Sequence, residues 1–350
     1  MKRNIIILSF LTGLSLSMVA QTKVTEFNPG VAANGVNYAL PRTVLKVNAS
    51  ATKMVYTPGE YAKYAERYLH ISGVSTEPST TWQLQQLNVY QEGEPDTTKL
   101  FTVKLKDKSV APFVQLSPSG ILLSVNTSAK VEEQPSTATR TTRHQMNARQ
   151  YLTGDILSAT SVAKRAELTA QEILDIRESK NEIKRGEVES MPKDGASLKI
   201  VLDELDAQER ALTQLFVGYT DTTFTEKVFS VTPAADINRQ VFFRFSQKLG
   251  FVDADDLAGD PYYLTVKDQR SVTLPDEKEL AKRKIDGLVY NMPSMAEVKI
   301  ENLQGTVYNR SWPFAQFGTI DMLAPTLFNK GTTTRLTLYP ATGAILHLEQ

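Results

Sequence analysis

The chain has 350 residues, 39 basic and 39 acidic side chains, and no cysteine. Its balanced charge, without a long basic block, argues against a nucleic-acid partner or an anionic membrane surface. The lack of cysteine excludes disulfides, thiol catalysis, cysteine-ligated metals and the lipid anchor of an exported lipoprotein.

The first twenty residues have the pattern of a secretory signal peptide. A positive start, Met1-Lys2-Arg3, precedes the apolar run at residues 5–16, and the small residue Ala20 precedes the expected cleavage site. Cleavage there removes two basic residues and leaves a net charge of 37 − 39 = −2. No second apolar run is long enough to cross a bilayer. We therefore expect an exported protein of the periplasm or cell envelope, without a transmembrane segment after cleavage.

Residues 21–130 are expected to form an N-terminal β-rich module, because short stretches alternate between apolar and polar side chains. The expected strands are residues 36–47, 82–90, 100–105, 114–116 and 121–125. Between the second and third of these, Glu92, Glu94 and Asp96 predict an acidic hairpin loop.

One short helix is expected within this module, from Thr57 to about Leu69. Thr57, Pro58 and Glu60 have the spacing of a helix start with a capping box. Three tyrosines would share one face of this helix: Tyr61, Tyr64 and Tyr68. They are candidate ligand-binding residues, and the alternative is that their rings cover a sheet while their hydroxyls reach water.

Residues 131–147 are polar and predict a linker, and residues 148–218 predict a long helical hairpin. The first apolar stripe consists of Leu152, Ile156, Ala159, Ala163, Ala166, Ala170 and Ile173, and the second of Leu198, Val201, Leu202, Leu205, Leu212, Leu215 and Phe216. Pro192 and the pair Asp194-Gly195 lie between them and indicate a turn. The alanines of the first stripe would allow the two helices to approach closely.

Residues 219–350 are expected to form a C-terminal β-rich module of several short strands, with one charged helix at residues 276–285. The predicted fold class is therefore α+β, with two β-rich, sandwich or barrel-like modules flanking the helical hairpin. A weak internal repeat relates the two modules. It pairs Tyr38-Ala39-Leu40-Pro41 with Tyr290-Asn291-Met292-Pro293, and residues 116–123 with 338–346. Duplication and the coincidence of two hairpin turns both explain it.

No catalytic motif is present, and calcium is the one cofactor that the sequence suggests. The loop with Asp253, Asp255, Asp256 and Asp260 is rich in the oxygen ligands that calcium prefers, although it lacks the glycine and the closing glutamate of an EF-hand. A solvated turn is the alternative. Two further candidate ligand-binding aromatic residues are Trp312 and Phe314.

Several stretches together resemble a domain-of-unknown-function family of exported proteins from Gram-negative gut anaerobes. The matching residues are 38–43, 58–69, 203–206, 215–218, 243–246 with Gly250, 315–318 and 342–344. The resemblance implies the compartment and the length of the chain, and it transfers no catalytic residue.

The function that we expect is an exported, non-enzymatic binding or scaffolding protein of the periplasm or envelope. Its partner would be an unknown envelope protein or glycan. The alternative is a glycan-acting hydrolase, whose mechanism needs two carboxyl groups about 5 to 10 Å apart, one of them protonated.

Overall fold

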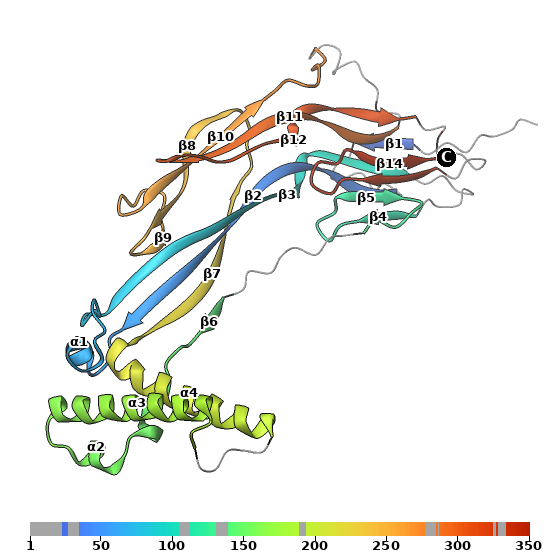
Figure 1. The fold of residues 1–350 in the computed structure, drawn as a ribbon. Helices are drawn as coiled ribbons and strands as arrows, with labels where there is room; N and C mark the ends of the chain where they lie inside the picture. The colour runs from blue at the N-terminus through green and yellow to red at the C-terminus, as the bar shows by residue number, and fades with distance from the viewer. Residues whose placement is uncertain are drawn as a thin grey trace, which may run out of the picture.

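The computed structural model describes residues 23–26, 35–104, 113–130, 139–188, 194–276, 285, 287–324, 327 and 334–350. The protein is α+β and mostly strand, with three antiparallel sheets and a group of helices at one end (Figure 1). The predicted signal peptide, residues 131–138 of the predicted linker and most of the predicted helix at 276–285 lie outside these ranges.

The first sheet forms a long ribbon that runs from the body of the protein to the helices (Figure 1). Its strand order is β1 (Lys23–Glu26), β3 (Ser79–Lys104), β2 (Gly35–Thr57), β7 (Tyr219–Val231) and β6 (Arg140–Thr142). Because β7 follows the helices in sequence and pairs with β2, this sheet combines strands from both predicted β-rich regions.

The other two sheets complete the body. The second has the order β12 (Gly305–Leu323), β11 (Leu288–Asn302), β10 (Asp260–Asp268), β8 (Ile237–Ser246) and β9 (Gly250–Val252). The third has the order β14 (Ile345–Glu349), β13 (Arg335–Leu338), β5 (Leu122–Val125) and β4 (Val114–Leu116). The pairing of β13 with β5 again joins strands from the two ends of the chain.

Strand β2 is much longer than its sequence predicts, since it continues ten residues beyond Val47 to Thr57. The extension contains Ala49, Ser50 and Ala51, which have little intrinsic preference for strands. These residues are paired on both sides, with β3 and with β7. Two neighbouring strands satisfy the backbone groups there, so tertiary context overrides the local preference.

Strand β3 corrects the predicted acidic hairpin loop, because residues 79–104 form one strand. Glu92 lies opposite β2 and forms an ion pair with Lys46, and Glu94 pairs with Arg42 at 3.2 Å. Opposite charges directly across two strands favour their pairing. Glu92 and Glu94 therefore belong to the paired ribbon, while Asp96 lies in the stretch of β3 that has no register partner on β2.

The helices form a unit that we call the helical head. It consists of η1 (Ala62–Tyr64), α1 (Ala65–Leu69), η2 (Ala148–Tyr151), α2 (Gly154–Ser158), α3 (Val162–Arg185) and α4 (Gly195–Val217). Its core buries Ala166, Ala170 and Ile173 of α3 together with Leu212 and Phe216 of α4.

The first long helix begins later than its apolar stripe predicts. The chain is extended at Ala159 and Ser161, and Ser161 caps α3 by accepting a hydrogen bond from the Lys164 backbone. Residues 154–158 consequently form the separate short helix α2. Helix α3 ends at Gly186, which has a left-handed backbone with φ of 73°.

The short helix after β2 also differs from its prediction, because Thr57 is the last residue of β2 and caps nothing. The backbone of α4 holds the next residues instead. The Tyr61 N–H donates to the Leu215 carbonyl at 2.7 Å, and a Cβ on Gly59 would lie 2.3 Å from that oxygen. This contact replaces the expected cap, and α-helix begins only at Ala65.

Polar side chains join the three sheets at a site that we call the sheet junction, defined by Tyr38, Thr43, Asn291 and Gln316. The buried Asn291 Nδ2 donates to the carbonyls of Pro41 at 2.9 Å and Thr342 at 2.8 Å. The side-chain amide of Gln316 accepts from the Thr43 N–H and donates to the Thr43 carbonyl, both at 2.9 Å.

Tyr38 adds a further link at the junction, because its hydroxyl accepts from the Val289 N–H at 3.0 Å and faces the Val289 carbonyl at 3.3 Å. Tyr38 and Asn291 are almost completely buried. Buried polar groups of this kind fix one arrangement of the surrounding strands, because any shift leaves them without partners.

The two halves of the internal repeat have the same local structure. In the β2–β3 hairpin, one residue, Leu40, lies opposite residues 96–99, and in the β11–β12 hairpin Pro293 lies opposite residues 315–318. A turn glycine supports each irregularity. Ala39 N–H donates to the Gly120 carbonyl at 2.9 Å, and Asn291 N–H donates to the Gly343 carbonyl at 3.1 Å. The contacts to the two turn glycines fall at corresponding positions of the repeat, Ala39 and Asn291, whereas the irregularities at Leu40 and Pro293 are displaced from each other by one residue.

A group of ion pairs connects α3 with α4. Arg177 Nε lies 2.6 Å from Glu209 Oε1, and Lys180 Nζ pairs with both Asp206, at 2.6 Å, and Glu209. Burial alone would raise the pKa of Glu209, but hydrogen bonds from Lys180 and Arg177 outweigh this and lower the pKa. A lowered pKa in the folded state stabilises the protein above the pKa of the unfolded state.

Asn291→Ala should lower the free energy of unfolding by roughly 2–4 kcal/mol, because two buried carbonyls lose their donor. Chemical denaturation of the purified protein measures this. The matched control is Asn309→Ala, since Asn309 is exposed on β12, the partner strand of β11. Equal stability of the two variants would show that the junction amide does not hold the sheets together.

Glu209→Gln should cost about 1 kcal/mol of stability at pH 7, because an ionic cross-link between α3 and α4 is lost. The difference from the wild type should disappear as the pH falls through the lowered pKa of Glu209, where its carboxylate becomes protonated. Thermal melts at several pH values measure this, with the exposed α4 residue Glu204→Gln as control. A difference from the wild type that stays constant as the pH is lowered through the acid range would contradict the electrostatic origin.

Candidate functional site

A cleft of about 520 Å³ opens in the helical head. It lies between the segment that follows β2, the residues around η2, the helix α2 and the first turn of α3. Small-molecule sites in proteins typically have volumes of about 300–1,000 Å³. The polar side chains that line the cleft are Glu60, Gln145, Asn147, Arg149 and Arg165, and the apolar ones include Met146, Leu152, Ile156, Leu157 and Leu215.

One wall of the cleft is held in place by the Gln214 side chain of α4. Its Oε1 accepts from the Met146 N–H at 2.8 Å, and its Nε2 donates to the His144 carbonyl at 2.6 Å. The His144 N–H in turn donates to the Asp221 carboxylate at 2.7 Å, so the same segment is also attached to β7. These bonds give an otherwise irregular segment a defined position beside α2 and α3.

Arg165 is the charged group at the boundary between the cleft and the core. Its Nη2 lies 3.4 Å from Glu60 Oε1, and the two side chains are 36% and 51% exposed. Such an exposed ion pair contributes little to stability. The Arg165 Nε is buried and has no hydrogen-bond partner in the described part of the chain, so the guanidinium has unused donors.

Tyr61 forms an apolar wall of the cleft. It is almost fully buried and its ring contacts Phe216 edge-on, with 5.4 Å between the centroids. Burial, followed by the nearby Glu60 carboxylate, raises the pKa of its phenol, against smaller opposing effects of Arg165 and Thr169. The hydroxyl therefore stays protonated at neutral pH.

The three predicted tyrosines do not form one ligand-binding stripe. Only Tyr61 lines the cleft. Tyr64 and Tyr68 stack on each other with 6.0 Å between the centroids, and the Arg67 guanidinium lies 5.3 Å from the Tyr68 ring. The change to 3₁₀ geometry at residues 62–64 separates the directions of the side chains that a single α-helix would align.

Trp312 and Phe314 lie in the body, where they pack in the core between the first two sheets. Phe314 is completely buried against Phe317. Trp312 is half-buried, and its Nε1 donates to the Tyr308 hydroxyl at 2.7 Å. Phe314 in particular has no surface on which a ligand could stack.

The loop of acidic residues before β10 forms a hydrogen-bonded turn. Asp256 Oδ1 accepts from the Ala258 N–H at 2.8 Å, and the Asp256 N–H donates to the Asp253 carbonyl at 3.1 Å. Across the described ranges, no three His, Asp or Glu side chains are grouped so as to hold a metal ion. The geometry gives no support to calcium binding by Asp253, Asp255, Asp256 and Asp260.

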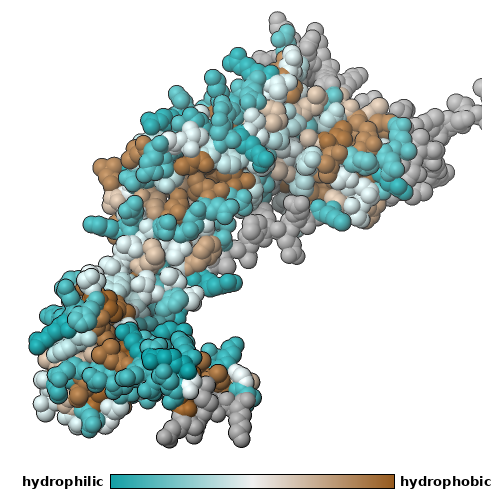
Figure 2. Space-filling model, in the orientation of Figure 1, coloured by the Kyte–Doolittle hydropathy of each residue, from teal (hydrophilic) through white to brown (hydrophobic). Residues whose placement is uncertain are grey.

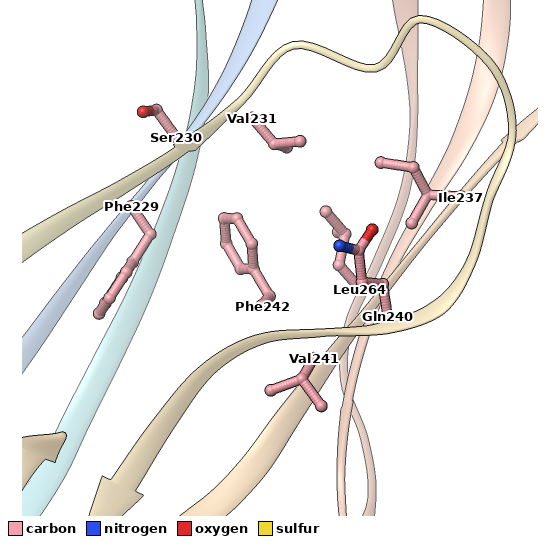
Figure 3. Close-up of a pocket in the computed structure, with 8 residues that line it drawn as sticks. All are labelled: Phe229, Ser230, Val231, Ile237, Gln240, Val241, Phe242 and Leu264. Atoms are coloured by element: carbon pink, nitrogen blue, oxygen red, sulfur yellow. The ribbon is translucent and has the colours of Figure 1, made fainter. Parts of the chain in front are cut away.

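A second, smaller pocket of about 220 Å³ lies between β7 and β8. Figure 3 shows Val231, Phe242, Ile237 and Leu264 around one space, which the connection between β7 and β8 borders. Gln240 is the main polar side chain at this pocket, and no carboxylate lines it. The cleft in the head has one carboxylate, Glu60, so neither pocket contains the pair of acids that glycoside hydrolysis needs.

Two features of the sequence involve residues of the cleft, but they can be assigned to one site only once the fold is known. Arg165 lies in the first turn of a helix that has no acidic residue there, which is an unusual place for a cation. Arg149, Gln145 and Asn147 lie in a stretch with no periodicity, and nothing in the sequence relates them to Glu60, some ninety residues earlier.

Comparison with known proteins identifies a family but not an activity. None of the helices within the described ranges is long and apolar enough to span a bilayer. No curated protein and no solved structure matches the chain. The family model described as "Domain of unknown function (DUF4831)" matches residues 34–346, which is nearly the whole chain. The protein therefore belongs to the DUF4831 family.

Proposed function

We propose that the protein is an exported, non-enzymatic binding protein of the periplasm or cell envelope, and that the cleft in the helical head is its binding site. The observation that carries this proposal is the composition of the cleft. It combines an apolar wall with several donors and a single carboxylate, Glu60. This set can bind and orient a ligand but lacks a second acid for hydrolysis.

The position of the head fits a binding or scaffolding role. The ribbon of β2, β3 and β7 places the helices at one end of an elongated molecule, away from the second and third sheets (Figure 1). Figure 2 shows mainly hydrophilic and neutral residues where the ribbon approaches the head. The cleft is thereby presented to the surroundings, while the body remains free to contact an envelope protein or glycan.

The export part of the proposal depends on the pattern at the start of the chain, a positive end followed by an apolar run and Ala20. Expression of the full chain in a Gram-negative host, followed by mass spectrometry of the periplasmic fraction, examines it separately. We expect a mature chain that begins at Gln21. Recovery of a chain with Met1 intact would contradict export by cleavage.

The binding role is tested by methyl NMR of the mature protein against a library of small acids, amines, sugars and dipeptides. We expect saturable shifts at Ile156, Leu152 and Leu215 of the cleft, because these methyl groups line it. Ile237 and Leu264 of the second pocket serve as reference methyls. Each bound compound should be recovered unchanged by mass spectrometry after incubation. Shifts confined to the reference methyls, or cleavage of a bound compound, would overturn the proposal.

A further inference from the structure

We infer that the cleft selects an aliphatic carboxylate. In this arrangement the carboxylate lies between the guanidinium groups of Arg149 and Arg165, and the hydrocarbon part covers Leu152, Ile156 and Leu215. The inference rests on the proposed function and names the class of ligand for the same site.

The charged side chains that line the cleft are positive in sum. Arg149 and Arg165 line the cleft against one carboxylate, Glu60. The first turn of α3 contains no acidic residue, and the positive end of the helix dipole adds to the charge of Arg165. Lys164 in the same turn is compensated by Glu167 at 2.9 Å, which leaves Arg165 as the available cation of this turn, beside Arg149 of the neighbouring segment. An anion is the ligand that this field favours.

The guanidinium groups of Arg149 and Arg165 make few hydrogen bonds within the protein. A guanidinium has five N–H donors in a planar fork that matches the two oxygens of a carboxylate. Arg165 makes one ion-pair contact, to Glu60 at 3.4 Å, and its buried Nε has no partner. Arg149 is exposed and has no ion-pair partner within the described ranges. A ligand carboxylate would bind the exposed part of these two guanidinium groups, whereas the buried Nε of Arg165 is not accessible to it.

Apolar side chains line the cleft beside these two arginines. Ile156 is almost completely buried under the cleft, and Leu152 and Leu215 are partly buried around it. Leu157, which also lines the cleft, is 60% exposed. A hydrocarbon chain would remove the exposed surface of Leu157 and the accessible parts of Leu152 and Leu215 from water, which a small inorganic anion would not do. The cleft therefore favours an anion with an aliphatic part.

Glu60 acts as an internal competitor in this arrangement. Its carboxylate holds Arg165 weakly in the unliganded protein, because both side chains are well exposed. A ligand carboxylate must displace it or accept its repulsion. Removing the charge of Glu60 should consequently tighten binding of the ligand. Tighter binding cannot result from unfolding of the variant, because an unfolded variant would bind less ligand.

Isothermal titration of the mature protein with octanoate and with octanamide tests the inference. We expect octanoate to bind at least tenfold more tightly than octanamide, and acetate to bind weakly because it lacks the aliphatic part. Acetyl-Leu-Leu and its C-terminal amide form a second matched pair. Comparing octanoate with acetyl-Leu-Leu shows whether the cleft prefers a free aliphatic acid or the terminal carboxylate of a peptide. A preference for the acid in either pair supports the inference.

Three variants accompany these titrations. Arg165→Gln should weaken octanoate binding at least tenfold, and Glu60→Gln should tighten it several-fold. Arg335→Gln should change nothing, because Arg335 pairs with Glu349 in the third sheet, far from the head (Figure 1). Equal affinity for acids and amides, or an unchanged affinity in both cleft variants, overturns the inference. The proposed function survives that result if neutral or cationic compounds still shift the methyl groups of the cleft.

Discussion

The structure depends on the pairing of β2 along both of its edges. From Leu45 to Tyr56, every residue of this strand faces β3 on one side and β7 on the other, apart from a single irregularity at Ser50 and Ala51. One end of β2 enters the sheet junction through Tyr38 and Thr43, and the other end leads directly into the segment that packs against α4. Strand β2 is therefore the central strand of the ribbon that connects the body of the protein with the head.

The sheet junction explains why the two ends of the chain form one body. Side chains of β2 donate to and accept from backbone groups of β11, β12 and the turn before β14, at sequence separations of about 250 to 300 residues. The related irregularities at Leu40 and Pro293, each supported by a turn glycine, bring two similar hairpins to this point. The mixed composition of the first and third sheets comes from the pairing of β2 with β7 and of β5 with β13.

Local sequence signals predict the tight turns and the span of α4, but not the length of β2 and β3 or the start of the short helix after β2. The hairpins around Gly120 and Gly343 follow from their turn residues, and Ala166 and Ala170 of α3 are buried as their spacing indicates. The continuation of β2 through Ala49 to Ala51 and the course of β3 through Glu92 and Glu94 depend on neighbouring strands, which the local sequence does not show.

The cleft is the part of the protein that sequence reasoning predicts least. It draws on five separate segments, and its charged groups have no pattern until the fold brings Glu60 to Arg165 and Gln214 fixes the wall around Met146. Phe314 is a candidate ligand-binding residue in the sequence because aromatic side chains often contact ligands. In the structure it is completely buried in a hydrophobic core. The physical reason is that a surface site depends on long-range assembly, whereas turns and helix faces depend on near neighbours.

Hydrogen exchange along β2 is the most direct test of this account. If the strand joins head and body as one folded unit, the amides from Leu45 to Tyr56 should exchange slowly and at similar rates, because each is paired with β3 or β7. If the amides from Thr52 to Tyr56 exchange as quickly as those of an unfolded peptide while Leu45 to Asn48 stay protected, the head is only tethered to the body, and the account is wrong.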